Sequence, residues 1–229
     1  MIISGLQKLS LIDYPQKISS VVFTQGCLFR CPYCHNPELI DLKTKNPLGE
    51  ETILEYLAER KNMLEGVCIT GGEPTLHSDL PEFMAKIKAL GLLVKLDTNG
   101  TNPRMIEKII QRGLANYFAL DLKHAWSNYD QVALTNNPTA IKNCQKTFEL
   151  IQNSGIDHEF RTTVFPQVHQ EKDFVEMAGY LKPGEKYFLQ NIRYLKNLDP
   201  NLDKTKILDV PGIIRRLRRQ FPQIIIEER

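Results

Sequence analysis

Short apolar runs alternate with amphipathic stretches along most of this chain, and that alternation limits the fold more than any other feature. Six runs are rich in Val, Ile, Phe and Tyr, and several are apolar nearly throughout, as is typical of parallel strands covered by helices. The runs cover Ser20–Thr24, Gly66–Thr70, Leu92–Thr98, Tyr117–Leu122, Glu159–Phe165 and Lys186–Asn191. The stretches between them predict helices over Glu50–Asn62, Leu80–Leu90, Pro103–Arg112, Pro138–Asn153 and Glu171–Leu181.

Six strand–helix units in this order predict an α/β fold. Right-handed crossovers would curl the units into a barrel or part of one. A complete eight-unit barrel typically takes ~250 residues, whereas this chain has 229. We therefore expect an incomplete, open-sided (β/α)6 TIM-like barrel with short N-terminal and C-terminal extensions. Residues 1–229 are expected to form one domain, with a core over about 18–191 and a C-terminal extension over 192–229 that holds a helix from Val210 and a strand over Gln223–Ile226.

The composition limits which binding partners and which cellular compartment the chain is expected to have. The net charge is only +2 and 24% of the residues are charged, so no overall charge favours nucleic acid or an anionic membrane. No apolar stretch is long enough to span a bilayer, and the N-terminus does not resemble a secretory signal. Three of the five cysteines are crowded into eight positions, which does not resemble a disulfide framework. We therefore expect a cytoplasmic protein.

Polar residues and glycines follow the ends of the expected strands, while the strand bodies are apolar. In a β/α barrel the functional residues collect at the C-terminal ends of the strands. The residues at these ends are, in chain order, Cys27, Gly71–Pro74, Asp97–Gly100, Asp121–Lys123, Arg161–Thr163 and Gln190–Asn191. Their coincidence on one rim indicates a functional site there.

Each of these motifs also has a structural interpretation. Gly71-Gly72 is compatible with a tight turn, and the Asn-Gly of Asp97–Gly100 is a common turn signal. Asp121 could cap the next helix, and Lys123 could be an ordinary solvated lysine. The joint occurrence of all of them beside three cysteines favours the functional interpretation.

Cys27, Cys31 and Cys34 have the spacing C-x3-C-x2-C on one short segment. Three soft thiolates at this spacing indicate an iron–sulfur cluster or a zinc ion. A 4Fe–4S cluster normally takes four cysteines, so three leave one iron with an open position, as reactive metal centres have. The zinc alternative would add His35 as a fourth ligand, although adjacent Cys34 and His35 point poorly at one ion. Cys68 and Cys144 lie in an expected strand and helix and are interpreted as core residues.

Five segments of the chain resemble a known superfamily. The cysteine motif with Tyr33 before its last cysteine, followed by Gly-Gly-Glu-Pro, resembles the radical S-adenosylmethionine (SAM) superfamily. Residues 25–36, Leu96–Gly100 and Leu120–Lys123 resemble its glycyl-radical-enzyme activases, and Gly5–Pro15 resembles the short activating proteins of anaerobic ribonucleoside-triphosphate reductase. The resemblance covers Gly5 to about Asn191.

This resemblance implies a radical activity. Cys27, Cys31 and Cys34 would hold three irons of a 4Fe–4S cluster, and SAM would chelate the fourth. Reductive cleavage of SAM would give a 5′-deoxyadenosyl radical, which takes a hydrogen atom from a glycine of a partner glycyl-radical enzyme. The implied partners are anaerobic ribonucleotide reductase and a low-potential electron donor such as flavodoxin or ferredoxin.

The resemblance also implies roles for other rim residues. Gly71 and Gly72 would leave room for the backbone to approach the methionyl group, Glu73 would pair with its ammonium, and Lys123 and Arg161 would bind its carboxylate. Tyr33 and His35 would flank the adenine. A monovalent cation would lie beside Asp97, Thr98 and Asp121, for which the alternative is that the two aspartates cap loops.

One segment departs from the family pattern. Activases of the pyruvate formate-lyase type have a cofactor-binding histidine just past the sixth strand, where this chain has Gln190–Tyr194. Either Gln190 or Arg193 could take its place. Two alternative functions stay open: a radical SAM enzyme that acts on a small molecule, as deazaguanine-forming synthases do, and a zinc-binding interaction module.

Overall fold

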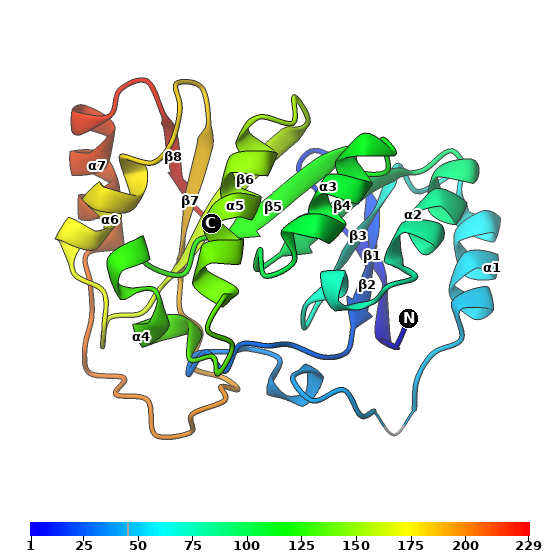
Figure 1. Ribbon diagram of the computed structural model, residues 1–229, viewed down its shortest axis with the longest axis horizontal. Helices are drawn as coiled ribbons and strands as arrows, with labels where there is room; N and C mark the ends of the chain where they lie inside the picture. The colour runs from blue at the N-terminus through cyan, green and yellow to red at the C-terminus, as the bar shows by residue number, and fades with distance from the viewer. Residues whose placement is uncertain (45) are drawn as a thin grey trace.

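A single eight-stranded sheet forms the centre of the molecule, and its strands lie in chain order from β1 to β8 (Figure 1). The computed structural model describes residues 1–44 and 46–229. The strands are β1 Ile3–Ser10, β2 Ser19–Thr24, β3 Gly66–Gly71, β4 Leu93–Thr98, β5 Tyr117–Asp121, β6 Asp157–Val164, β7 Lys186–Asn191 and β8 Ile225–Glu228. β1 pairs antiparallel with β2, and every later pair is parallel.

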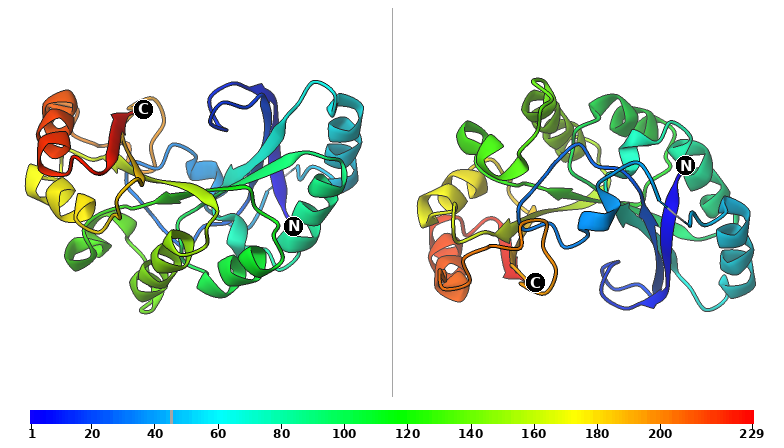
Figure 2. Two further views of the ribbon diagram at one scale, coloured as in Figure 1. Left: turned by 90° about the horizontal axis from the view of Figure 1, so that it is seen from above. Right: turned by 90° about the horizontal axis from the view of Figure 1, so that it is seen from below.

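Helices connect the parallel strands and lie along the outer side of the curved sheet (Figure 2). They are α1 Glu50–Arg60, α2 Leu80–Ala89, α3 Pro103–Gln111, α4 Asp130–Ala133, α5 Ala140–Gln152, α6 Glu171–Ala178 and α7 Val210–Gln220. β1 and β8 lie at the two ends of the arc and are not neighbours in the sheet. The expected α/β fold with an incomplete, open-sided barrel is therefore confirmed.

Helices α3 and α7 each begin at a residue whose side chain caps the first turn. Asn102 accepts a hydrogen bond from the backbone N–H of Met105, and Asp209 accepts one from Gly212, so both satisfy donors that a helix leaves free. In each case a proline follows in the first turn, where its missing N–H costs nothing. The apolar faces of the helices pack on the sheet and bury Leu, Ile, Val and Phe side chains in one continuous core.

Two elements were not expected from the sequence, and a third lies two residues from its expected place. β1 was not expected, because its residues Ile3–Ser10 are mostly half-buried or exposed and mix polar with apolar side chains. It stays in the sheet through antiparallel pairing with β2. The short helix α4 was also missed, since four residues are too few to show a helical period. The last strand was expected over Gln223–Ile226 and lies two residues later, at Ile225–Glu228.

The segment after β2 determines where the site can form. In Figure 1 this segment runs across the lower edge of the sheet, where the parallel strands end. Gly26 and Cys27 begin it, and their backbone N–H groups donate to Leu39 and Ile40 at 2.7 and 2.8 Å. Among residues 1–44 and 46–229, no helix has the length and apolar character needed to cross a membrane.

Candidate cluster and cofactor site

A pocket of about 220 Å³ lies at the C-terminal ends of the strands. It brings together residues from the segment after β2 and from the ends of β3, β4, β5, β6 and β7. All but one of the residues expected at the site line it: Cys27, Cys31, Tyr33, Cys34, His35, Gly71, Gly72, Asp97, Thr98, Asp121, Lys123, Arg161 and Gln190. The exception is Glu73.

In the segment after β2 (residues 25–40, the cysteine loop), the three cysteines face this pocket to different depths. Cys31 is buried, whereas Cys27 and Cys34 are half-buried. A turn joins the last two, since the Cys34 backbone N–H donates to the Cys31 carbonyl at 2.9 Å. In the described parts of the chain, no three Cys, His, Asp or Glu side chains converge on one point as ligands of a single ion would. Ligands of a four-iron cluster bind separate irons, so this spread of the sulfur atoms is compatible with a cluster.

The environment of these thiols keeps them protonated when no metal is bound. Burial raises the pKa of Cys27 to about 11 and that of Cys31 to about 12. It also raises the pKa of Cys34, and the Lys123 ammonium lowers all three in part. Metal binding releases the protons of thiol ligands. The loop is therefore a set of neutral thiols that a metal would convert to thiolates.

Gly71 and Gly72 are required by backbone packing. Gly71 has a φ of +115°, and a Cβ there would lie 2.4 Å from the backbone nitrogen of Thr24. A Cβ on Gly72 would lie 2.2 Å from the carbonyl oxygen of Gly26. The two glycines were expected to let the backbone approach the methionyl group. The close contacts show that the turn also packs against the backbone at the end of β2 and the start of the cysteine loop, and the approach to the methionyl group stays a prediction.

Glu73 lies behind the wall of the pocket and is fully buried. Its Oε1 accepts hydrogen bonds from the Thr98 hydroxyl at 2.8 Å and from the Thr75 backbone N–H at 3.1 Å. Its Oε2 accepts from the Asn99 backbone N–H at 2.6 Å. The expected pairing of Glu73 with the methionyl ammonium is therefore corrected: both oxygens join the Gly-Gly-Glu turn to the end of β4.

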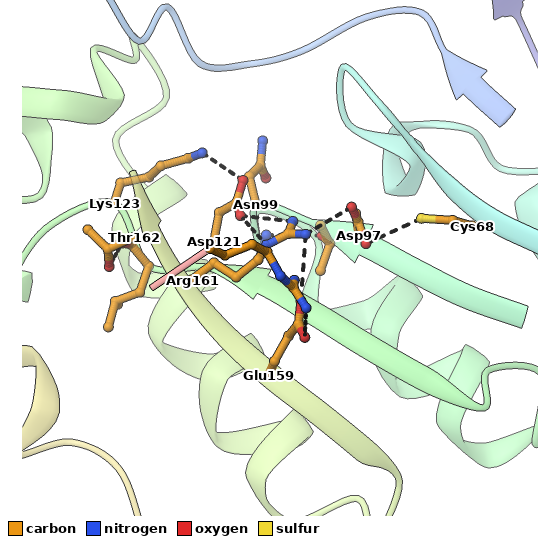
Figure 3. Close-up of polar contacts among 12 residues, drawn as sticks. Cys68, Asp97, Asn99, Asp121, Lys123, Glu159, Arg161 and Thr162 are labelled. Carbon is orange, nitrogen blue, oxygen red and sulfur yellow. Dashed lines mark hydrogen bonds and ion pairs between the residues drawn. The ribbon is translucent and has the colours of Figure 1, made fainter. Parts of the chain in front are cut away.

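Arg161 lies between two carboxylates of neighbouring strands (Figure 3). Its guanidinium is 3.1 Å from Asp97 of β4 and 3.0 Å from Asp121 of β5. Asp121 also pairs with Lys123 at 2.9 Å, and Asp97 with the buried Lys95. Burial opposes ionisation of Asp121, but Lys123 and Arg161 outweigh it and hold the pKa of this carboxyl well below its usual range. The rim is therefore a network of ionised, mutually paired groups.

This pairing bears on the expected monovalent cation. Two carboxylates, Asp97 and Asp121, face three basic groups, and the Thr98 hydroxyl donates to Glu73. All three expected ligands thus have partners within the protein. The cation remains a prediction from the resemblance, and the geometry of these groups does not add to it.

The Arg161 network continues to the end of the chain. The fully buried Glu159 lies 3.8 Å from the Arg161 guanidinium and accepts a hydrogen bond from the Tyr117 hydroxyl at 2.9 Å. It also pairs with Arg229, whose guanidinium stacks 4.3 Å from the centre of the Phe188 ring. Neither Glu159 nor Arg229 was expected near the site, because their approach depends on how β6, β7 and β8 align.

The aromatic residues of the cysteine loop frame the pocket. The Tyr33 ring packs edge-on against Phe165 at 5.5 Å, and the Lys123 ammonium lies 5.9 Å from its centre. The Tyr33 hydroxyl is buried without a hydrogen-bond partner among the described residues. His35 accepts a hydrogen bond from the Arg193 backbone N–H at 3.3 Å. An unpaired buried hydroxyl beside three thiols fits a site that receives a polar group.

A second hollow of about 560 Å³ adjoins the pocket on the open side of the barrel. His35, Asn36, Arg161, Thr163 and Gln190 line both spaces. The second hollow also has Ile12, Asp13, Arg193 and Arg229 in its wall. Of the two alternatives for the last cofactor contact, Gln190 therefore reaches the inner pocket, whereas Arg193 lines the outer hollow.

Sequence reasoning placed Asn99 on the rim, within Asp97–Gly100, but gave it no role at the site. Its side-chain amide donates to the Cys27 sulfur at 3.6 Å, and the residue lines the pocket. Asn36 also lines the pocket without having been expected there, and Thr163 was expected only as part of the rim segment Arg161–Thr163. The signal was present for Asn99, which belongs to the Asp-Thr-Asn-Gly motif, but the same letters also describe a plain turn.

Known proteins with similar sequences are consistent with this geometry. The family model described as the radical SAM superfamily matches residues 21–181. A Methanocaldococcus jannaschii protein provisionally named a glycyl-radical enzyme activating enzyme is 36% identical over 195 residues, which are 82% of this chain and 79% of that protein. The pyruvate formate-lyase-activating enzyme of Staphylococcus aureus strain USA300 is 31% identical over 221 residues, or 89% of this chain and 78% of that enzyme.

Solved structures share the fold at lower sequence identity. Streptococcus suis SuiB bound to S-adenosylmethionine matches with a TM-score of 0.69 and 14% identity, over 91% of this chain and 49% of SuiB. The protein anSMEcpe with bound AdoMet matches with a TM-score of 0.65 and 16% identity, over 89% of this chain and 61% of that chain. This chain thus spans about half the length of SuiB. The cysteine pocket, the family match and the two sequence relatives agree, and the chain belongs to the radical SAM superfamily, which uses a 4Fe–4S cluster and S-adenosylmethionine, within its family of glycyl-radical-enzyme activating enzymes.

Proposed function

We propose that this protein installs a glycyl radical on a partner enzyme, and that the partner is anaerobic ribonucleoside-triphosphate reductase. The observation that carries the proposal is one pocket that joins three loop cysteines to a charged rim at the ends of β4, β5 and β6. Two relatives named as activating enzymes support the radical activity on a protein glycine. When bound, the cluster and SAM supply the electron and the 5′-deoxyadenosyl group that abstract a hydrogen atom.

Cys27, Cys31 and Cys34 would hold the cluster. Their donor set suits iron, since soft thiolates are the usual ligands of iron–sulfur clusters. Three cysteines would leave one iron of the cluster open for SAM. The five cysteines are all free thiols, which fits a reducing, cytoplasmic setting for an oxygen-sensitive cluster.

The charged rim would orient SAM. Lys123 and Arg161 are the basic groups that line the pocket and would bind the methionyl carboxylate in exchange for part of their pairing with Asp121. The negative charge of Asp97 and Asp121 would stabilise the sulfonium. Gln190 reaches the pocket from β7 and would complete the contacts to the cofactor.

The cysteine loop and the Gly-Gly turn would enclose the rest of the cofactor. Tyr33 and His35 stand at the wall beside the cysteines and would flank the adenine. Gly71 and Gly72 present backbone rather than side chain to the pocket. Glu73 would act indirectly, by fixing the turn to Thr98 and Asn99.

The choice of reductase rests on the first residues of the chain. Gly5–Pro15 is the segment that resembles the short activators of this reductase. Its Ile12 and Asp13 line the outer hollow, beside Gln190 and Arg193. A glycine of the partner must enter through an open side to reach the inner pocket, so these residues would contact the loop that carries it. Residues 1–229 would act as one domain, because the sheet continues from β1 to β8.

The experiment that tests the proposal compares candidate partners. The protein is reconstituted anaerobically with iron and sulfide, reduced by a flavodoxin or ferredoxin system, and mixed with SAM and one glycyl-radical enzyme at a time. We expect the electron paramagnetic resonance signal of a glycyl radical on the anaerobic reductase and none on pyruvate formate-lyase. A signal on pyruvate formate-lyase alone would contradict the choice of partner. 5′-Deoxyadenosine without a radical on any partner would favour a small-molecule substrate.

A further inference from the structure

Asn99 lies at the end of β4 with three of its four polar groups held by the protein. Its side-chain oxygen accepts hydrogen bonds from the backbone N–H of Thr101 at 3.0 Å and from the Thr101 hydroxyl at 2.8 Å. Its backbone N–H donates to Glu73 at 2.6 Å, and its carbonyl accepts from the Cys144 thiol at 3.1 Å. The residue is 6% exposed. These contacts fix the orientation of the amide.

The remaining group, the side-chain NH₂, points at a cysteine of the loop. Asn99 Nδ2 lies 3.6 Å from Cys27 Sγ, and the Phe29 backbone N–H lies 3.4 Å from the same sulfur. Across residues 1–44 and 46–229, no other side chain donates to a sulfur of the three loop cysteines. Because Thr101 occupies the amide oxygen, a flipped amide would lose two hydrogen bonds and place an oxygen against the sulfur. The donor is therefore preorganised.

We propose that Asn99 is a positioning residue that raises the reduction potential of the cluster through an N–H···S bond to Cys27. The inference rests on the proposed function only in taking Cys27 as a cluster ligand. Hydrogen bonds to the sulfurs are among the factors that set iron–sulfur potentials. An N–H donor stabilises a sulfur more as the sulfur gains negative charge, and the ligand sulfurs gain charge when the cluster accepts an electron.

The step involved is a one-electron reduction. The electron comes from a low-potential protein or chemical reductant, no bond in the protein forms or breaks, and the amide transfers no proton. Asn99 changes only the relative stability of the oxidised and reduced states. It also links the Gly-Gly-Glu turn to the cysteine loop, since Glu73 holds its backbone while its side chain reaches Cys27.

The test measures a midpoint potential rather than turnover. Asn99→Ala removes the donor, and Asn99→Asp keeps the shape and the acceptor for Thr101 while replacing the N–H donor with oxygen. The matched control is Asn102→Ala in the same loop, whose amide donates to the Thr75 carbonyl at 2.7 Å and caps α3. Each protein is reconstituted anaerobically and titrated with dithionite without SAM, and the signal of the reduced cluster is followed by electron paramagnetic resonance.

We expect both Asn99 variants to have a more negative midpoint potential than the wild type, with a larger shift for Asp because of its charge. Asn102→Ala should lower the melting temperature and leave the potential unchanged. Potentials of both Asn99 variants equal to that of Asn102→Ala, or more positive, would overturn the inference.

Two further variants keep the test decisive. If the Asn99 variants fail to hold a cluster, Thr101→Val removes one of the two hydrogen bonds that orient the amide and should give a smaller negative shift; no shift would overturn the inference. Cys27→Ala checks the assignment on which the inference rests. A full, unchanged cluster in Cys27→Ala would contradict the proposed function, whereas a normal wild-type cluster with unshifted Asn99 variants would contradict the inference alone.

Discussion

Adding one methyl group at Gly72 should disrupt the junction between the Gly-Gly turn and the cysteine loop. The new Cβ would lie 2.2 Å from the carbonyl oxygen of Gly26 and 2.9 Å from that of Leu39, and Cβ atoms in proteins essentially never approach other atoms closer than 3.0 Å. Both obstacles are backbone atoms of the cysteine loop, so no side chain can rotate away. The loop itself has to move.

The structure sets the size of this effect. Overpacking of a close-packed site costs about 1–3 kcal/mol. Moving the Gly26 carbonyl also weakens the hydrogen bond that it accepts from the Glu73 N–H at 2.7 Å, which adds about 1 kcal/mol. We expect Gly72→Ala to lower the free energy of unfolding by about 2–4 kcal/mol, which corresponds to a fall of roughly 5–15 °C in melting temperature for a chain of this length.

The assay is thermal unfolding of the protein without cluster or SAM, followed by iron and sulfide analysis after reconstitution. Gly49→Ala is the matched control, because its Cβ would meet only the Thr52 hydroxyl at 3.5 Å and its φ is −67°. The control should unfold within about 2 °C of the wild type, because Gly49 is an exposed N-cap of α1 without a side-chain cap bond, where a change to Ala costs about 0.5 kcal/mol. Equal melting temperatures for the two variants would refute the packing argument for Gly72.

Three further predictions concern the charges. Arg161→Ala leaves Asp97 and Asp121 without their shared partner, so the free energy of unfolding of the cluster-free protein should fall by about 3–5 kcal/mol. Urea unfolding measures this free energy, and a loss below about 1 kcal/mol would contradict the claim that the buried ion pairs stabilise the fold. Burial and the neighbouring His124 lower the pKa of His169 from 6.5 to about 4, so His169 stays neutral in the fold and stability is lost as the pH falls below 6.5. The two pKa values give a loss of about 2 kcal/mol in the free energy of unfolding between pH 7.5 and pH 5. His169→Gln should flatten this part of the plot of unfolding free energy against pH; an equally steep plot would show that other groups cause the loss. If a monovalent cation binds beside Asp97, Thr98 and Asp121, replacing sodium and potassium with tetramethylammonium should slow 5′-deoxyadenosine formation; an unchanged rate would contradict the cation, in keeping with the partners that these groups have within the protein.

Sequence reasoning found the elements whose residues show a hydrophobic pattern over a short stretch of the chain. The six central strands are short and several are apolar nearly throughout, so their ends and the polar residues that follow them could be placed within one or two residues. β1 escaped notice because its pairing partner, and not its own pattern, holds it in the sheet. α4 is one turn long and has no period to detect.

The site shows the same division. The positions of the strand ends predicted which residues gather at the site. They did not predict which of these residues contact one another. Arg161 meets Asp121 because the two are directly paired across β5 and β6, and a sequence alone does not state that register. Glu73 was expected to face the cofactor, but its partners lie 25 and 26 positions further along the chain. Contacts of this kind depend on the assembled sheet, as does the approach of Arg229 to Glu159.

The most direct test of the central claim follows one hydrogen atom. The anaerobic reductase is produced with glycine deuterated at Cα, and the reconstituted protein, a reductant and unlabelled SAM are added. The account predicts that 5′-deoxyadenosine gains one deuterium while the glycyl radical appears, and that Cys31→Ala abolishes both. 5′-Deoxyadenosine that forms at the normal rate with no deuterium would contradict the claim that this protein takes its hydrogen atom from a glycine of the reductase.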